Sequence, residues 1–163
     1  MKKFLGDENL AEEYSDGSMF ILRLTPPDYH RFHSPFDCAI KGSKKIKGIY
    51  ESVNPIVYAL GLNPLESNER QILFLDSKKF GEVLFITVGA MMVGKIKFTY
   101  DSRCQLCKGN EMGYFEFGGS TVVLLFKRNT VTIPENFVTN SAEGYETQVK
   151  VGQVIGTSIS QDA

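Results

Sequence analysis

Four short runs of branched and aromatic residues constrain the fold more than any other feature of this sequence. Each run is bounded by Gly, Pro, Asp or Lys, which is typical of β-strands. None of them approaches the roughly 18 apolar residues of a membrane-spanning helix. We therefore predict strands at Met19–Leu24, Gln71–Leu75, Val83–Val88 and Val122–Phe126.

Other segments have helix, bend or hairpin signals. Phe4–Tyr14 spaces apolar residues among acids, which predicts one short amphipathic helix, and Asn54–Leu62 begins with an asparagine cap and a proline, which favours a second. We expect the apolar residues 56–65 to lie in the core rather than in a lid or membrane-facing loop. Gly81–Lys97, with three glycines, predicts a bent pair of strands, and Gln148–Ile155 predicts a hairpin.

The predicted fold class is mainly β (α+β). Residues 1–163 have the length and composition of a single compact domain, here one of bent antiparallel strands with one or two short helices.

Charge and cysteine content argue against a nucleic-acid partner, a disulfide framework and a metal site. The net charge is -1, so no nucleic-acid partner is expected, and the four lysines in Lys41–Lys47 fit either an anionic lipid surface or a solvated loop. Three cysteines do not suggest a disulfide framework, and the lone CxxC at Cys104–Cys107 has no second ligand pair, so no metal site is predicted. The first residues do not resemble a signal peptide. We expect a soluble or peripheral protein.

Two groups of residues have chemical potential. The chain has two histidines, His30 and His33, and both lie in the proline-bounded segment 28–35. They are either a pair bonded to backbone or an acid–base pair. In the second group, Gly119 places an unhindered carbonyl before the hydroxyl of Ser120. This Gly-Gly-Ser is either a simple turn or a site where the serine attacks the preceding carbonyl.

Five motifs occur in an order that resembles the phosphatidylserine decarboxylase family. The resemblance runs from about Lys3 to Gly156, and its motifs are DYHRFHSP, Tyr-x-x-x-Asn-Pro, SNER, VGAMMVGKI and KGNEMGYFEFGGSTV. It implies a proenzyme that cleaves itself between Gly119 and Ser120, giving a β chain of residues 1–119 and an α chain of residues 120–163 that remain partners. Ser120 would become a covalent pyruvoyl cofactor, and no external cofactor would be needed.

The resemblance also implies residue roles, a substrate and a location. His33 matches the base for self-cleavage, and His30 matches the histidine of decarboxylation. The substrate would be phosphatidylserine and the product phosphatidylethanolamine. The protein would be peripheral at a membrane surface, and a homodimer is one alternative for its oligomeric state.

One part of the family pattern lies outside this sequence. The aspartate that orients the self-cleavage histidine belongs to a Ser-Pro-x-Asp-Gly motif upstream of residue 1, and an unoriented imidazole loses its fixed tautomer. Asp37, four residues after His33, is a candidate substitute for this aspartate, although it matches a later family position and its spacing disfavours a contact with the ring. The alternative function is therefore a non-cleaving, catalytically inactive lipid-binding relative or fragment.

Overall fold

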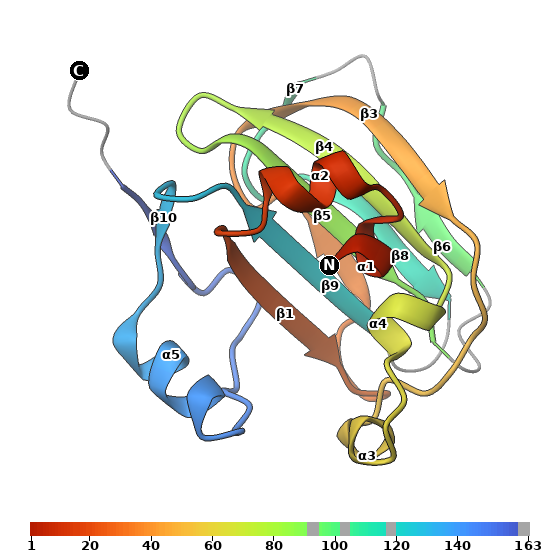
Figure 1. The fold of residues 1–163 in the computed structure, drawn as a ribbon. Coiled ribbons are helices and arrows are strands. Elements are labelled where there is room, and N and C mark those ends of the chain that lie inside the picture. Colours follow the sequence, from red (N-terminus) through yellow and green to blue (C-terminus); the bar gives the residue numbers. More distant parts are fainter. Residues whose placement is uncertain (91–94, 102–104, 117–119, 160–163) are drawn as a thin grey trace.

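The computed structural model describes residues 1–90, 95–101, 105–116 and 120–159 (Figure 1). Its elements, in chain order, are α1 (Lys2–Leu5), α2 (Glu8–Glu13), β1 (Ser18–Leu24), β2 (Arg31–His33), β3 (Cys38–Ile46), α3 (Pro55–Ala59), α4 (Pro64–Ser67), β4 (Arg70–Ser77), β5 (Gly81–Val88), β6 (Lys95–Phe98), β7 (Gln105–Leu106), β8 (Glu111–Glu116), β9 (Ser120–Phe126), β10 (Val131–Thr132), α5 (Glu135–Ala142) and β11 (Thr157–Ser158).

A six-stranded antiparallel sheet in the order β1-β9-β5-β4-β3-β7 forms the centre of the fold, beside a three-stranded sheet, β2-β8-β6, and the small pair β10-β11. The mainly β fold class is confirmed, and the four predicted strands correspond to β1, β4, β5 and β9. β5 and β6 lie in different sheets, and residues 91–94 of the expected bent pair lie outside the described residues.

Both faces of the large sheet are buried, which explains why its central strands are apolar at nearly every position. Along β9, Val122 and Leu124 pack toward the three-stranded sheet with Phe32 and Phe115. The intervening residues of β9 pack on the opposite face, beneath α1 and α2 (Figure 1). The sheet therefore separates two apolar clusters and holds β9 rigidly between its neighbours β1 and β5.

The predicted N-terminal helix is two helices. Gly6 ends α1 in the left-handed conformation, with φ of 58°, and the carboxylate of Asp7 then caps α2 by accepting from the amide of Leu10 at 3.1 Å. Arg70 anchors α1 to the sheet, because its buried guanidinium donates to the main-chain oxygens of Lys3 and Phe4. The expected single helix is wrong because a glycine followed by a capping residue breaks it.

The C-terminal prediction is also wrong. No strand occurs within 148–155; a tight turn closes there through the bond from the amide of Gln153 to the oxygen of Lys150, with Gly152 at φ of 81°. The helix α5, which precedes it, has no buried residue and an unfavourable content of Asn, Ser and Thr, so no sequence signal predicted it.

The second predicted helix is confirmed as α3, but its expected burial is wrong. Asn54 caps α3 by accepting from the amide of Ile56 at 3.0 Å. No residue of α3 is buried, and Ile56 and Leu60 are 64% and 72% exposed. Figure 1 shows α3 beyond the end of the sheet where β1 finishes, with none of the described helices or strands drawn over it.

Candidate active site

Ser120 and His30 are both linked to the end of the large sheet where β1 finishes and β9 begins. Ser120 is the first residue of β9, is fully buried, and pairs with Leu24, the last residue of β1. From Leu24 the chain turns through residues 25–29 to His30, whose main-chain oxygen accepts from the amide of Phe115 at 2.9 Å. Phe115 belongs to β8, which precedes Ser120 in the chain. His30 is therefore linked to the Ser120 end of the sheet in two ways, through β1 and through β8. Gly119, the other half of the predicted cleavage site, lies outside the described residues.

Two buried side-chain polar atoms have no hydrogen-bond partner in the described part of the chain. They are Oγ of Ser120 and Nε2 of His30. An unpartnered buried polar group costs about 1–3 kcal/mol, so folds retain few of them without a functional reason. Here both are potentially reactive atoms, one a nucleophile and the other a base.

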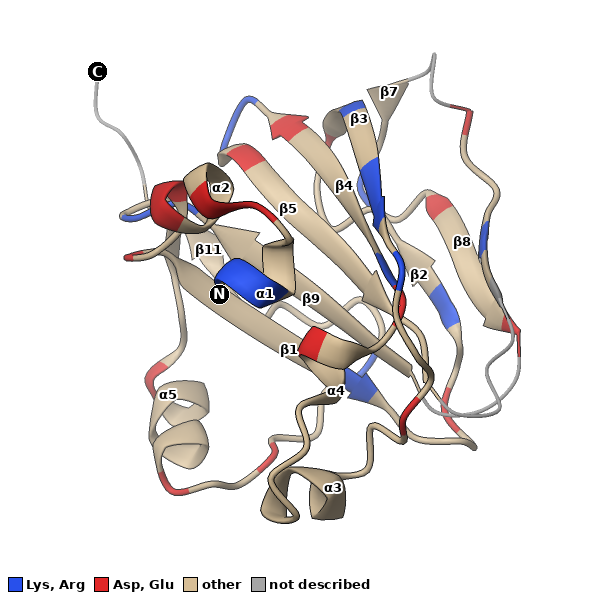
Figure 2. Ribbon diagram, turned by 45° about the vertical axis from the view of Figure 1, so that its right-hand side comes forward, with Lys and Arg blue, Asp and Glu red and all other residues tan. Residues whose placement is uncertain are grey.

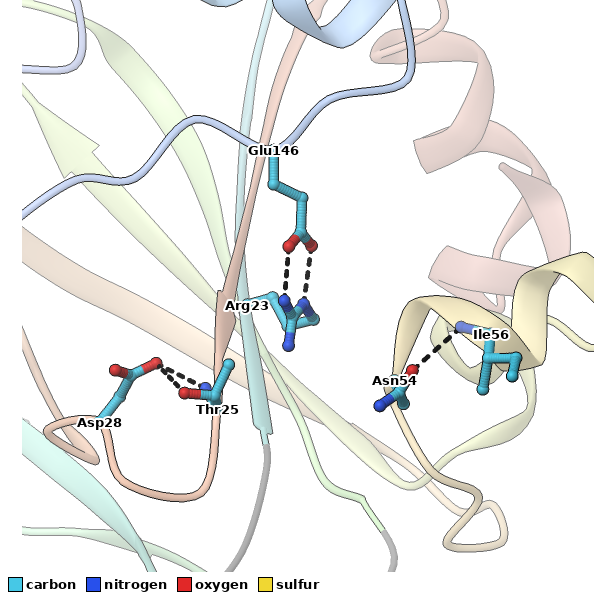
Figure 3. Close-up of polar contacts among 6 residues, drawn as sticks. All are labelled: Arg23, Thr25, Asp28, Asn54, Ile56 and Glu146. Atoms are coloured by element: carbon cyan, nitrogen blue, oxygen red, sulfur yellow. Dashed lines mark hydrogen bonds and ion pairs between the residues drawn. The ribbon is translucent and has the colours of Figure 1, made fainter.

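A turn at residues 25–28 fixes the tautomer of the neutral His30 ring. Nδ1 of His30 lies 2.6 Å from the main-chain oxygen of Asp28, and a carbonyl oxygen accepts only, so Nδ1 carries the hydrogen. The Asp28 carboxylate closes the turn by accepting from the amide and hydroxyl of Thr25 at 2.6 and 2.7 Å (Figure 3). These bonds from Thr25 hold the pKa of Asp28 below its usual value. The neutral His30 ring therefore has its lone pair on buried Nε2.

His33 has partners on both ring nitrogens. Nε2 lies 2.9 Å from the Tyr29 hydroxyl, whose ring stacks on the imidazole at 5.7 Å, and Nδ1 lies 3.0 Å from the main-chain oxygen of Gly109. His33 pairs with Glu111 on β8, whereas His30 bonds near the other end of that strand. Neither histidine bonds to Ser120 Oγ in the described part of the chain.

Asp37 does not contact the imidazole of His33 through any hydrogen bond of the described residues. Its carboxylate instead accepts from the amide of Lys108 at 2.8 Å.

The remaining candidate segments from the sequence are the lysine run and the CxxC pair. Three of the lysines in 41–47 are engaged, because Lys41, Lys44 and Lys45 form ion pairs with carboxylates. Of the CxxC cysteines, Cys107 is exposed and unpaired, and Cys104 lies outside the described residues.

An ion pair that the sequence did not predict lies beside Ser120. Arg23 faces Thr121 across the β1–β9 pair, and its guanidinium binds Glu146 through two bonds of 2.7 and 2.5 Å (Figure 3). The two residues are 123 positions apart, so no local pattern could have signalled the contact. Burial raises the pKa of Tyr58, which lies on α3. The charge of Arg23 lowers that pKa and the charge of Glu146 raises it. The exposed helix α3 is therefore a neighbour of this end of the sheet.

The apolar surface around α3 is continuous in sequence and free of charge. Residues 52–65 contain no Asp, Glu, Lys or Arg, and Figure 2 shows α3 without a charged position. We define the α3 surface as the large apolar side chains that are exposed in this stretch: Ile56, Tyr58, Leu60 and Leu62. Exposed apolar surface of this kind usually marks a contact with a partner or a membrane. None of the described helices is long and apolar enough to span a bilayer.

Comparison with known proteins gives one consistent result. Residues 1–157 match the family model described as phosphatidylserine decarboxylase. Phosphatidylserine decarboxylase proenzymes are 42% identical over 155 residues in Clostridium botulinum (strain 657 / Type Ba4), 44% over 161 residues in Ruminiclostridium cellulolyticum and 41% over 160 residues in Chlamydia trachomatis serovar L2. These alignments cover 95%, 99% and 98% of this chain but 52%, 54% and 53% of the relatives. The chain spans about half the length of the curated relatives it matches.

Proposed function

Because this chain belongs to the phosphatidylserine decarboxylase family, we propose that Ser120 is the precursor of a pyruvoyl group and that the protein converts phosphatidylserine to phosphatidylethanolamine. One observation carries the proposal. The buried atoms that lack partners in the described residues are the hydroxyl of Ser120 and Nε2 of His30, which are the nucleophile and the proton carrier that the chemistry needs.

Self-cleavage would begin with attack of Ser120 Oγ on the carbonyl carbon of Gly119. The peptide C–N bond breaks as the C–O bond forms, so the two residues become joined by an ester. Loss of the Cα hydrogen of Ser120 then expels the Gly119 carboxylate, and hydrolysis at residue 120 releases ammonia and leaves a ketone. Burial of Ser120 favours this course, because it keeps bulk water from the carbonyl during attack.

Two histidines would move protons, His33 in self-cleavage and His30 in decarboxylation. We propose His33 as the base of self-cleavage, since its Nδ1–H state places the basic lone pair on Nε2. The Tyr29 hydroxyl would have to leave Nε2 first. His30, with a free and buried Nε2, would hold the proton that is delivered to the carbon that loses carbon dioxide.

The residues of this end fit a pyruvoyl group, because the group would form from Ser120 where Oγ has no competing partner. When present, its ketone supplies an electrophile that takes the substrate amine and accepts the electrons released with carbon dioxide. After cleavage the α and β chains would stay associated, since β9 pairs with β1 along its whole length and with β5 from Thr121 to Phe126.

We also propose that the protein is peripheral and meets the bilayer through the α3 surface. Support comes from exposed Ile56 and Leu60 in a stretch without charge, adjacent to Arg23 and so to the end of the sheet that contains Ser120. A lipid substrate needs a site that opens toward the membrane, and apolar side chains flanked by tyrosine suit the interface.

Intact mass under denaturing conditions tests the proposal. We expect two fragments that divide between Gly119 and Ser120, with an α chain that resists amino-terminal sequencing and has lost ammonia. Purified protein with phosphatidylserine vesicles should then release carbon dioxide and phosphatidylethanolamine. A chain that stays whole and binds lipid without turnover would contradict the proposal and favour a non-cleaving lipid-binding relative.

A further inference from the structure

The feature that carries a further inference is the bond between Nδ1 of His33 and the main-chain oxygen of Gly109. A carbonyl oxygen has no hydrogen to donate, so Nδ1 must be the donor. In the neutral ring Nε2 then has the lone pair, and it accepts from the Tyr29 hydroxyl at 2.9 Å. The tautomer of His33 is thus set by a backbone group that lies 76 positions away in sequence.

The direction of the Gly109 carbonyl is set by a tight turn at Cys107–Asn110. The amide of Asn110 donates to the oxygen of Cys107 at 3.0 Å, and the Asn110 side chain accepts from the amide of Cys107 at 2.9 Å. Gly109 has φ of 88° at the third position of this turn, a conformation that a side chain disfavours. The glycine and the asparagine together hold the carbonyl that faces His33.

Three bonds fasten this turn to the segment that contains the histidine. Ser34, the residue after His33, accepts from the amide of Gly109 and donates its own amide to the oxygen of Asn110, both at 2.8 Å. The third bond is the one from the amide of Lys108 to the carboxylate of Asp37. Because Ser34 is buried while Asp37 is exposed, Asp37 is the member that can be changed without disturbing the core.

We infer that Asp37 and the turn at 107–110 are positioning residues, which hold the Gly109 carbonyl against His33 and so keep its hydrogen on Nδ1 and its lone pair on Nε2. The importance of this for catalysis rests on the proposed function, in which Nε2 of His33 accepts a proton. In serine hydrolases a carboxylate fixes the tautomer of the catalytic histidine, and the wrong tautomer costs about four orders of magnitude in rate. Here a backbone carbonyl does the same, and Asp37 acts one step further from the ring.

A carboxylate lies opposite His33 on the neighbouring strand β8. Glu111, the β-pair partner of His33, binds Arg31 and the hydroxyl of Thr99. The Thr99 bond, the Arg31 bond and the charge of His33 together hold the pKa of Glu111 below its usual value. Among the described residues, Glu111, Arg31 and Tyr29 are thus linked to His33 by pairing, bonds or stacking, whereas Asp37 acts on it through the turn that contains Cys107 and Lys108.

The test uses the full chain and compares Asp37→Ala with Asp37→Asn. The alanine removes the acceptor for the Lys108 amide, whereas the asparagine retains an oxygen there. Asp16→Ala, at an exposed ion pair with Arg128, is the matched control for loss of charge. Two readouts apply: the hydrogen-bearing ring nitrogen of His33 from long-range 1H–15N spectra, and the first-order rate of self-cleavage. The chain has two histidines, so a His30→Gln variant assigns the spectra.

We expect wild type to show His33 with hydrogen on Nδ1. Asp37→Ala should mix the tautomers and slow self-cleavage by about tenfold, Asp37→Asn should restore most of the rate, and Asp16→Ala should match wild type. Hydrogen on Nε2 in wild type, or an Asp37→Ala variant with unchanged spectrum and rate, would overturn the inference. If wild type is never cleaved but its spectrum and that of Asp37→Ala are as expected, the proposed function fails while the positioning of His33 stands.

Discussion

The main-chain oxygen of Asp28 lies 2.6 Å from Nδ1 of His30, and this bond gives His30 the same tautomer that Gly109 gives to His33. The two rings differ at Nε2. That of His30 is buried and has no partner in the described part of the chain, whereas that of His33 is capped by Tyr29. The two histidines thus share a tautomer but differ in how accessible Nε2 is. His30 can accept a proton at once, whereas His33 must first lose its bond to Tyr29, and this difference suits two different tasks.

His30→Gln should separate the two tasks. We expect self-cleavage to proceed at close to the wild-type rate, because His33 and its turn are untouched. Decarboxylation should fall by about 10²–10⁴-fold, the usual contribution of a positioned acid or base. Fragment masses report the first result and release of carbon dioxide from phosphatidylserine vesicles the second. Loss of cleavage in this variant would instead make His30 the base that acts on Ser120.

Tyr29→Phe should accelerate self-cleavage. The change removes the hydroxyl that occupies Nε2 of His33 but keeps the stacked ring. One hydrogen bond contributes about 1 kcal/mol net, so release of the lone pair should raise the rate by about fivefold. Time courses of fragment formation measure it, and Tyr145→Phe, at an exposed tyrosine, is the control. A slower Tyr29→Phe variant would show that the hydroxyl assists the reaction.

Ser120→Ala should give a single uncut chain without decarboxylase activity, since the nucleophile is absent. The buried Oγ has no partner within the described residues, so its removal should not destabilise the fold. Ser77→Ala is the control for cleavage, because Ser77 is another buried serine, at the end of β4, whose Oγ accepts from the amide of Lys79 at 3.3 Å. We expect that control to be cut normally. Denaturing mass spectrometry and urea unfolding decide both points, and a cut Ser120→Ala chain would place the scissile bond elsewhere.

Local sequence patterns predicted the central strands and the start of α3. The apolar runs of β5 and β9 are continuous because both sheet faces are covered, and the Asn54 cap marked the start of α3. The clustering of the two histidines was also visible in the sequence. Which ring nitrogen is free was not, because that depends on the oxygens of Asp28 and Gly109, one of them distant in sequence.

Exposure of the α3 surface was likewise beyond local prediction. The apolar content of residues 56–65 favours burial, and only the tertiary arrangement shows that α3 has no buried residue and that none of the described elements covers it. The pairing of β9 with β1 and the ion pair of Arg23 with Glu146 also join distant segments. Long-range contacts of this kind follow from how the whole core packs rather than from any motif.

Replacement of Ile56 and Leu60 together by serine should weaken binding to vesicles that contain phosphatidylserine. Loss of about 2 kcal/mol of apolar transfer for the pair corresponds to about a thirtyfold lower partition coefficient. The control is the double replacement of Val138 and Val151 by serine, since these are exposed apolar residues outside the α3 surface. Co-sedimentation at fixed lipid concentration measures both. Equal binding by the two double variants would mean that another surface meets the membrane.

Acidification should release the segment that Glu146 ties to β1. The bonds from Arg23 hold the pKa of Glu146 below its ordinary 4.5. A carboxyl with a depressed pKa stabilises the fold above the unfolded value, and this contribution is lost as the pH falls through the lower folded value. Glu146 is largely exposed, so solvent screening limits the effect to less than about 1 kcal/mol.

Hydrogen exchange measures this release at the amide of Tyr145, which donates to the oxygen of Asn140 next to the ion pair. After correction for the intrinsic exchange rate, protection at pH 6 should be up to about fivefold higher in wild type than in Glu146→Gln. The two proteins should converge as the pH falls below 4.5 and through the lower folded pKa, because wild-type Glu146 is then increasingly protonated. A constant difference across this range would mean that the charge of Glu146 does not hold the segment, and that packing around Tyr145 does.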